Sequence, residues 1–494
     1  MSHEKNELID LSFDALSERG NLAKVITNFN VRGEQQKMAA AVAEAISAQH
    51  DLVCEAGTGI GKTFAYLVPA LLSKKRTIVS TATRHLQDQI YFKDLPVVID
   101  ALDIDCQPAL LKGRANYLCM EKMRQATTQS VLDKTFAAKI NKVERWSFET
   151  SDGDISSMSD IAEDDSLWSW LTSTAENCLR KNCEYYDSCH VVNARQKAAE
   201  ADVVIINHAL LMADMTLKEE GFADFLPQAE LIIVDEAHQL KDFAERNFTE
   251  SFSSWLFTEV LKEITELIKE DPEQDASITD LMGLCTKSFR QFSGLFQTLG
   301  ERAPIKALRA HPSFAEHYQH FVEQGNVLIR ALKPYKVKSE QWENCIQRIT
   351  TMLKFIEAVC MSGDDAKVGE VAGLAWIDRH AKAKTFHIYL SPVDISSLLS
   401  EKSKQYQANW VYTSATLSVK DDFSYFLSDC GDESKPCKSF ASPFDYQAQA
   451  ALYLPDQMPL PGTEDYTNQL IERVYPILSM SKGRALLLFT SYKF

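Results

Sequence analysis

The segment EAGTGIGKT, residues 55–63, constrains the fold of this chain more than any other feature. It follows the apolar run DLVCEA and precedes a helical pattern, which is the context that a phosphate-binding loop requires. Glycines at positions 57, 59 and 61 let the backbone turn its N–H groups and a helix N-terminus toward phosphate oxygens. A glycine-rich turn without function is the alternative, but it leaves the strand, the helix and the lysine unexplained. We therefore expect an α/β domain that binds a nucleotide.

The residues of this loop have different expected roles at the nucleotide. Lys62 should contact the β- and γ-phosphates of ATP, and the Thr63 hydroxyl should bind Mg²⁺. The remaining loop residues should surround the phosphates, and they are Ala56, Gly57, Thr58, Gly59, Ile60 and Gly61.

A second motif, VDEAH at residues 234–238, ends another apolar run. A parallel sheet presents its ligands at the carboxyl edge, so Asp235 should hold Mg²⁺ through water. Glu236 is the candidate base that orients and polarises the attacking water, because phosphoryl transfer depends on in-line positioning and charge neutralisation. His238 completes the expected nucleotide contacts. An isolated DEAH could simply begin a helix, but the phosphate loop upstream favours the catalytic interpretation.

Short apolar runs predict the strands of a mostly parallel sheet, because they lack the alternation of half-exposed strands. These runs lie at residues 51–56, 76–82, 202–208, 231–238, 410–417 and 484–491. Helical patterns at 33–48, 62–73 and 86–91 separate several of them, which indicates a doubly wound α/β architecture.

Two long stretches interrupt this α/β pattern and are expected to be insertions in one nucleotide-binding domain. The first, 101–200, holds clustered cysteines, and the second, 241–375, is helical. One apolar stripe in the second stretch consists of Phe257, Val260, Leu261, Ile264, Leu267 and Ile268.

Four of the eleven cysteines form a set that one insertion brings together: Cys119, Cys178, Cys183 and Cys189. Four thiolates could bind Zn²⁺ or a [4Fe–4S] cluster, and their spacing excludes neither. Unrelated, separately packed cysteines are a third explanation. The other seven are expected to pack as small apolar side chains, and they are Cys54, Cys106, Cys285, Cys345, Cys360, Cys430 and Cys437.

The net charge of −17 means that any DNA path has to be locally basic. Cations and tyrosines are interleaved around the four clustered cysteines: Lys112, Arg114, Arg180, Lys181, Arg195 and Lys197, with Tyr117, Tyr185 and Tyr186. Such a surface suits single-stranded DNA through phosphate attraction and base stacking, although ordinary surface charge explains it equally well. No apolar stretch is typical of an export signal or a membrane span, so we expect a cytoplasmic protein without a membrane partner.

The ordered motifs resemble those of the DinG/YoaA branch of the XPD-like superfamily 2 helicases over almost the whole chain. Besides the phosphate loop, the cysteines and DEAH, the resemblance rests on R-x-x-Q-x-x-M (32–38), STATRHLQDQI (80–90), LLKGRANYLC (110–119), INHALLMAD (206–214), YTSATLS (412–418) and SPFDY (442–446). It implies a 5′ to 3′ DNA helicase that uses ATP, Mg²⁺ and a [4Fe–4S] cluster on those four cysteines. Single-stranded or forked DNA is the implied substrate, in DNA repair or replication-fork rescue, and replication and single-strand-binding proteins are candidate partners.

The resemblance also assigns roles to residues outside the two main motifs. Arg32 and Gln35 match the adenine-side motif, where Gln35 could form a bidentate hydrogen bond to the base. Residues 414–416 match the motif that couples ATP state to DNA grip, and Asn207 with His208 matches a motif beside the cluster domain. Without the resemblance, Arg32 and Gln35 could simply belong to a surface helix. Residues 414–416 could be an ordinary strand end, and His208 a hydrogen-bonded histidine of the core.

The implied architecture is a RecA-like motor lobe with two insertions, followed by the start of a second lobe. Motor lobe 1 occupies 1–100, 201–240 and 376–430, the iron–sulfur insertion 101–200, the helical arch 241–375, and the start of motor lobe 2 occupies 431–494.

The sequence departs from the family pattern in two places. Ile60 replaces a threonine inside the phosphate loop, and phosphate binding should survive because this position contributes mainly backbone. About 50 residues follow SPFDY, whereas a domain needs about 100–150, and later family motifs with their arginines have no counterpart. We therefore expect weak ATP binding and slow hydrolysis relative to a parent with both lobes. An ATP-gated DNA-binding or scaffolding module without unwinding is the alternative, favoured for this chain alone, and no set of metal-binding carboxylates indicates a nuclease.

Overall fold

The computed structural model describes residues 2–129, 134–174, 177–219, 226–270, 276–362, 367–368, 371–380, 384–461 and 463–488. The chain divides into two compact units, residues 1–442 and 443–494, and each is described by itself.

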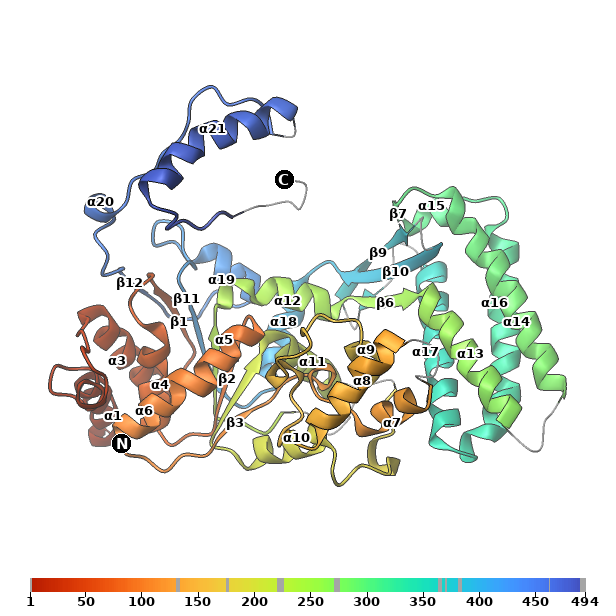
Figure 1. The fold of residues 1–494 in the computed structure, drawn as a ribbon, viewed down its shortest axis with the longest axis horizontal. Coiled ribbons are helices and arrows are strands. Elements are labelled where there is room, and N and C mark those ends of the chain that lie inside the picture. The colour runs from red at the N-terminus through yellow and green to blue at the C-terminus, as the bar shows by residue number, and fades with distance from the viewer. Residues whose placement is uncertain are drawn as a thin grey trace. The chain divides into compact units, whose positions relative to one another are not determined.

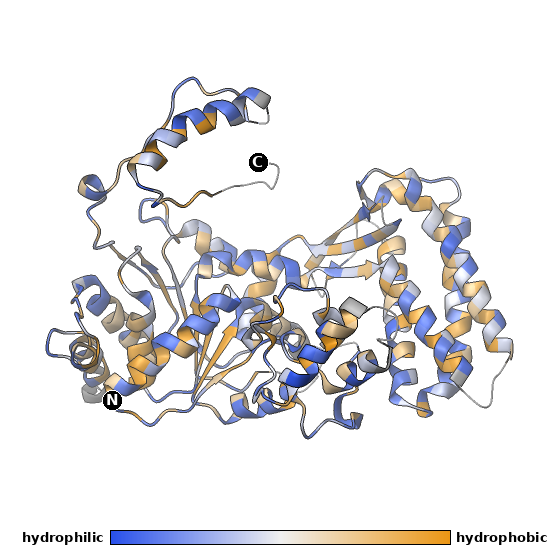
Figure 2. Ribbon diagram, viewed as in Figure 1, coloured by the Kyte–Doolittle hydropathy of each residue, from blue (hydrophilic) through white to orange (hydrophobic). Residues whose placement is uncertain are grey.

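A seven-stranded parallel sheet forms the centre of the first unit, with the order β12-β1-β11-β5-β2-β4-β3 (Figure 1). Its strands are β1 (Leu52–Ala56), β2 (Thr77–Thr81), β3 (Pro108–Leu110), β4 (Val203–Asn207), β5 (Leu231–Asp235), β11 (Asn409–Ser414) and β12 (Cys437–Phe440). Figure 2 shows the hydrophobic character of the central strands. The expected α/β class with a parallel sheet is confirmed.

Helices cover both faces of this sheet, and alternate strand residues enter two different cores. Val53, Ile78 and Ile232 face one core, whereas Leu52, Val79 and Ile233 face the other. The second core includes α3 (Gly33–Ala48), α4 (Lys62–Leu72) and α6 (Leu95–Leu102). The first core includes α11 (His208–Glu219), α12 (Leu240–Phe248), α18 (Ile395–Lys404) and α19 (Ser424–Cys430). Burial of both faces explains why the strands read as continuous apolar runs.

The remaining helices near the start of the chain are α1 (Ser2–Ala15), α2 (Asn21–Val25) and α5 (Arg84–Gln89). Helix α5 continues through a π-helical turn, Ile90–Asp94, into α6. The predicted helices at 33–48 and 62–73 are confirmed within one residue, and the one at 86–91 falls on α5 and this turn.

The first insertion lies between β3 and β4 and has a small core of its own. Its helices are α7 (Met120–Gln129), α8 (Lys134–Ser147), α9 (Trp168–Leu171) and α10 (His190–Glu200). Leu118, Val143 and Trp168 are among the buried residues of this core. A separate core of this kind lets the insertion hold its shape beside the sheet.

The second insertion was expected to be helical, and it also contains an antiparallel sheet that the sequence analysis did not predict. The helices are α13 (Ser254–Glu270), α14 (Ala276–Leu295), α15 (Ile305–Arg309), α16 (Phe314–Leu332) and α17 (Glu340–Ser362). The strands are β6 (Glu250–Ser253), β7 (Arg302–Pro304), β8 (Lys367–Val368), β9 (Val371–His380) and β10 (Thr385–Pro392). The apolar stripe of α13 is buried as predicted, with Leu267 partly buried.

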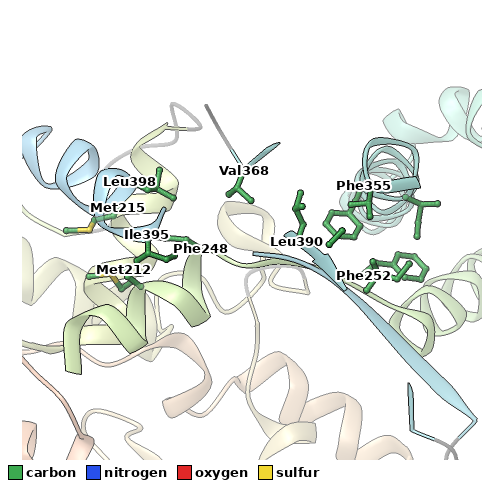
Figure 3. Close-up of a cluster of buried hydrophobic side chains, with 14 of the residues drawn as sticks. Met212, Met215, Phe248, Phe252, Phe355, Val368, Leu390, Ile395 and Leu398 are labelled. Carbon is green, nitrogen blue, oxygen red and sulfur yellow. The ribbon is translucent and has the colours of Figure 1, made fainter. Parts of the chain in front are cut away.

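One continuous apolar core joins the parallel sheet to this second insertion. Figure 3 shows its side chains from α11, α12 and α18 through to the antiparallel sheet and α17: Met212, Met215, Phe248, Ile395, Leu398, Val368, Leu390, Phe252 and Phe355. The insertion is therefore packed against the lobe rather than attached by a linker alone.

The second unit includes α20 (Tyr446–Gln449) and α21 (Glu464–Met480). Five of the six predicted strands are present. The sixth, expected at 484–491, is not a strand over 484–488, and its remaining residues lie outside the described part of the chain. Residues 431–494 were expected to begin a second lobe. Strand β12 of this segment instead pairs with β1 and belongs to the parallel sheet of the first unit. Within the described ranges, no helix is long and apolar enough to cross a membrane.

Candidate functional site

The glycines of the phosphate loop are required by backbone conformation and by close packing. Gly59 and Gly61 have positive φ values of 86° and 89°, a region that favours glycine. A Cβ on Gly61 would lie 2.4 Å from Gln35 Nε2, and one on Gly57 would lie 2.7 Å from the backbone nitrogen of Ser442. The loop therefore holds a fixed conformation between β1 and the N-terminus of α4, the arrangement that receives phosphate groups.

The phosphate-loop lysine and the DEAH glutamate are in direct contact. Lys62 Nζ lies 2.9 Å from Glu236 Oε1, and each of the two side chains is less than a quarter exposed. Glu236 has a positive φ of 54°, which is uncommon outside glycine and is found at functional sites. The structure thus brings together two residues 174 positions apart that the sequence analysis assigned to phosphate binding and catalysis.

The carboxylate of Asp235 lies at the carboxyl edge of the sheet, and no ion pair to it is formed among the described residues. Its Oδ2 accepts a 3.4 Å hydrogen bond from Thr81 Oγ1, while its buried Oδ1 has no hydrogen-bond partner within the described part of the chain. Burial raises the pKa of Asp235 to about 7; Lys62 opposes this shift and Glu236 adds to it. An orphaned, buried carboxylate oxygen fits a divalent cation, and Thr63 in the first turn of α4 supplies a hydroxyl of the kind Mg²⁺ binds.

His238 and the end of β11 complete a polar network around Glu236. His238 Nδ1 lies 2.7 Å from Ser414 Oγ, which donates a 3.3 Å hydrogen bond to Glu236 Oε2. The carboxylate of Glu55 accepts hydrogen bonds from the backbone N–H groups of Leu417 and Ser418. Glu236 therefore has two partners at the same time, Lys62 at Oε1 and Ser414 at Oε2. The segment after β11 is fixed to the strand that leads into the phosphate loop.

Arg32 and Gln35 contact the phosphate loop itself. Gln35 is buried and its Nε2 donates a 3.0 Å hydrogen bond to the Gly61 carbonyl, while Arg32 Nη1 lies 3.5 Å from the Ile60 carbonyl oxygen. These contacts brace the loop, a role that the sequence analysis did not assign. Contact of Gln35 with adenine stays a prediction.

The four clustered cysteines share one neighbourhood without forming a closed coordination sphere. Cys119 precedes α7, whereas Cys178, Cys183 and Cys189 lie on the segment that leads into α10, and all four are partly exposed free thiols. Burial raises the pKa of Cys119 and of Cys183, and the nearby charges of Cys178 and Cys189 add to both shifts. The donor chemistry and proximity fit a thiolate-bound group, although the described residues contain no group of three or more ligands placed to hold a metal ion.

The seven other cysteines largely follow the expectation of packed side chains. Five are buried, and Cys106 and Cys437 are partly exposed.

Two residues of the expected cationic and aromatic surface are not on the surface, so the prediction was wrong for them. Lys112 is 1% exposed, and its Nζ lies 2.8 Å from Asp88 Oδ1 of α5 and 2.7 Å from Asp154 Oδ2 of the insertion. Tyr117 is buried, and its hydroxyl accepts a hydrogen bond from the Lys112 backbone N–H. Burial opposes the charge on Lys112, but the two carboxylates outweigh it and raise its pKa. Lys112 is therefore a structural link between the sheet domain and the insertion.

The other members of that surface differ in exposure. Arg180, Lys181 and Lys197 are exposed, whereas Arg114, Arg195, Tyr185 and Tyr186 are partly buried. Burial, with repulsion from Arg114, lowers the pKa of Arg195 to about 10. Lys181 and Lys197, together with Arg180, are therefore solvent-exposed cations of this insertion.

A cavity of about 580 Å³ lies between the parallel sheet and the first insertion. Its lining includes Thr83 and Arg84 after β2, Asn116 before the first clustered cysteine, Asn207 at the end of β4, and Phe243 of α12. Arg84 Nη1 lies 3.2 Å from Glu163 Oε2, and both side chains are about half exposed. The cavity thus combines amide groups, the Arg84–Glu163 ion pair and one aromatic ring.

The parallel sheet, the phosphate loop and the DEAH segment at its carboxyl edge define this chain as a P-loop ATPase. Residues 35–142 match the family model described as DEAD/DEAH box helicase. The ATP-dependent DNA helicase YoaA of Haemophilus influenzae is 36% identical over 482 residues, which cover 96% of this chain and 73% of that protein. The chain therefore belongs to the DinG/YoaA-type family of XPD-like helicases, an ATP-hydrolysing family.

Two further comparisons are more distant. The Bacillus subtilis protein named 3′-5′ exonuclease DinG is 26% identical over 552 residues, covering 99% of this chain and 58% of that protein. The match to the solved structure of Xpd4 from S. tokodaii covers 79% of this chain and 60% of the Xpd4 chain, with a TM-score of 0.41 and 16% sequence identity. The family assignment rests on the first relative.

Proposed function

We propose that the protein is an ATP-dependent DNA helicase that moves 5′ to 3′ on single-stranded or forked DNA during DNA repair or replication-fork rescue. The observation that carries this proposal is the contact of Lys62 with Glu236 beside Asp235, whose buried Oδ1 has no hydrogen-bond partner among the described residues. Family membership favours unwinding over the scaffolding alternative. Replication and single-strand-binding proteins are the proposed partners in the cytoplasm, and the order of motor, cluster and arch segments given above is the proposed domain plan.

Hydrolysis in this proposal follows from the two partners of Glu236. ATP phosphates replace Glu236 as the partner of Lys62, because a triphosphate carries more negative charge than one carboxylate. The freed carboxylate, held by Ser414 and in turn by His238, accepts the proton of the attacking water. Mg²⁺ held by Thr63 and Asp235 would neutralise charge on the phosphate oxygens.

The DNA strand is proposed to enter the cavity beside the first insertion. Phosphate oxygens would take the place of Glu163 as the partner of Arg84, and the amides of Asn116 and Asn207 supply hydrogen-bond donors. The exposed Arg180 and Lys181 extend the positive surface toward the clustered cysteines.

Strand displacement tests this proposal against its rival. Forked duplexes with either a 5′ or a 3′ single-stranded tail are incubated with the protein, ATP and Mg²⁺, and hydrolysis is followed with and without DNA. The helicase proposal expects stimulated hydrolysis and displacement from the 5′ tail. Stimulated hydrolysis without displacement would instead support the scaffolding module, and strand shortening would point to a nuclease.

Lys62→Ala is expected to reduce ATP turnover by about 100-fold or more while the protein stays folded. The side chain contributes charge to phosphate oxygens, and such preorganised charges are worth about 10²–10³ in rate. Single-turnover hydrolysis and thermal unfolding check this. Lys241→Ala is the matched control, because Lys241 forms a comparable ion pair with Asp429 outside the site. Wild-type turnover in Lys62→Ala would remove the phosphate-binding role.

We also propose that Cys119, Cys178, Cys183 and Cys189 hold a [4Fe–4S] cluster. Four thiolates would hold the irons, and the group would fix the insertion, since metal binding is coupled to folding of small metal-held domains. Free, partly exposed thiols in one neighbourhood support this proposal over separately packed cysteines.

Protein prepared without oxygen is expected to be brown and to contain about four irons per chain. Cys183→Ser should lower the iron content and increase proteolysis of the insertion. Cys106→Ser, outside the set and partly exposed, is the matched control and should keep the iron. Metal analysis by mass spectrometry and visible absorption measure both variants; stoichiometric zinc in colourless protein would replace the cluster by a zinc site.

A further inference from the structure

His208 is buried at the junction of three elements of the lobe. It begins α11 directly after β4, and its Nδ1 lies 2.8 Å from the hydroxyl of Ser80 in β2. Its ring meets the Phe243 ring of α12 edge to face, with centroids 5.4 Å apart and an interplanar angle of 79°. The ring can therefore respond to movement of α11, α12 or β2.

The same ring lies against the DEAH segment. Ser80 is in register with Val234 of β5 on one side and Ile206 of β4 on the other. Burial lowers the pKa of His208 to about 4, although the nearby backbone of Asp235 and Glu236 favours its charged form. Its Nε2 is buried without a regular hydrogen bond among the described residues.

Helices α11 and α12 and the segment that follows β2, all close to His208, line the cavity proposed to receive the DNA strand. Asn207 and Ala209, the chain neighbours of His208, belong to the lining, and so do Phe243 and the residues that follow β2. His208 itself is fully buried behind this wall. Its position therefore joins the proposed strand cavity to the backbone that places Glu236.

We propose that His208 is a positioning residue that couples strand occupancy of the cavity to the placement of Glu236. This inference rests on the proposed helicase function. Ser80 Oγ lies 2.8 Å from Nδ1. In the tautomer in which this hydroxyl donates to Nδ1, the ring proton is on Nε2, beside the backbone of the DEAH segment. A strand that shifts Phe243 or α11 moves the ring, and the ring moves Glu236 so that Oε1 leaves Lys62 while Oε2 keeps its hydrogen bond from Ser414. The paired and the released positions of Glu236 Oε1 relative to Lys62 provide the two states that such coupling requires.

His208→Asn tests the coupling, because its amide can reach Ser80 but leaves the Nε2 position empty. Single-turnover hydrolysis is measured with and without a single-stranded oligothymidine, and binding of the same oligonucleotide is followed by fluorescence anisotropy. The ratio of stimulated to basal hydrolysis should fall about tenfold, while the half-saturating oligonucleotide concentration changes by less than about threefold. His208→Gln, whose amide reaches the Nε2 position, should retain more of the stimulation. His320→Asn on the exposed side of α16 is the matched control.

Each outcome decides between coupling and a general structural role. An unchanged stimulation ratio in His208→Asn overturns the inference, and so does a loss of oligonucleotide binding that parallels the loss of stimulation. If His208→Asn does not fold, Ser80→Ala decides: a lowered ratio supports the coupling and an unchanged ratio overturns it. Wild-type protein that shows no stimulation at all would overturn the proposed helicase function, and the coupling with it.

Discussion

Glu236→Gln is expected to slow ATP hydrolysis by about 10²- to 10⁴-fold while nucleotide binding persists, because the amide keeps the shape of the side chain and loses its basic carboxylate. Binding should persist because the variant removes the negative charge that competes with phosphate for Lys62. Single-turnover hydrolysis and titration with a fluorescent nucleotide in Mg²⁺ separate these two effects.

The control for this variant is Glu245→Gln, an exposed glutamate on the neighbouring helix α12. It should leave both hydrolysis and nucleotide binding at wild-type levels. A folded Glu236→Gln protein that no longer binds nucleotide would show that Glu236 supports the binding site rather than the attacking water.

Lys112→Met is expected to lower the free energy of unfolding by about 3–5 kcal/mol, the usual cost of leaving a buried charge without its partner. Asp154 is 9% exposed at its side chain and would lose its cation, while Asp88 retains partial contact with water. Urea denaturation measures the loss, and hydrogen exchange should locate it at the junction between α5 and the first insertion.

Two comparisons make the Lys112 result specific. Lys139→Met breaks the more exposed pair with Asp165 and should cost less than about 1 kcal/mol. The double variant Lys112→Met with Asp154→Asn should recover part of the loss, because no buried carboxylate then lacks a partner. Equal losses for Lys112→Met and Lys139→Met would contradict a structural role for the buried lysine.

The parallel sheet could be predicted because its strands are buried on both faces and read as apolar runs. The antiparallel sheet was missed for a different reason. Phe386, Ile388 and Leu390 alternate with half-buried polar and aromatic residues, and this short signal lies beside long helices. Strand β3 has only three residues, and β12 only four, too few for periodicity to identify.

The site residues followed from local motifs, but their mutual contacts did not. Gln35 meets Gly61 across 26 positions, and Ser414 meets Glu236 across 178, so nothing within either motif indicates its partner. In the sequence, nothing distinguishes Lys112 from nearby cations such as Arg114, so its burial could not be predicted. Its burial depends on Asp88 and Asp154, which lie in different elements, and only the tertiary structure brings them together.

The position of β11 in the sheet has a consequence for how the protein is made. Strand β1, which leads into the phosphate loop, pairs with β11 and β12, and its Leu52 partner is Val411. During synthesis the phosphate loop, the four clustered cysteines, the DEAH segment and the whole second insertion therefore emerge from the ribosome before either strand partner of β1 is made. Such long-range pairing is slow and exposes apolar strand edges to other chains. The nascent protein is thus expected to depend on chaperones until residues beyond 440 emerge, and nucleotide binding should be one of the last properties it acquires.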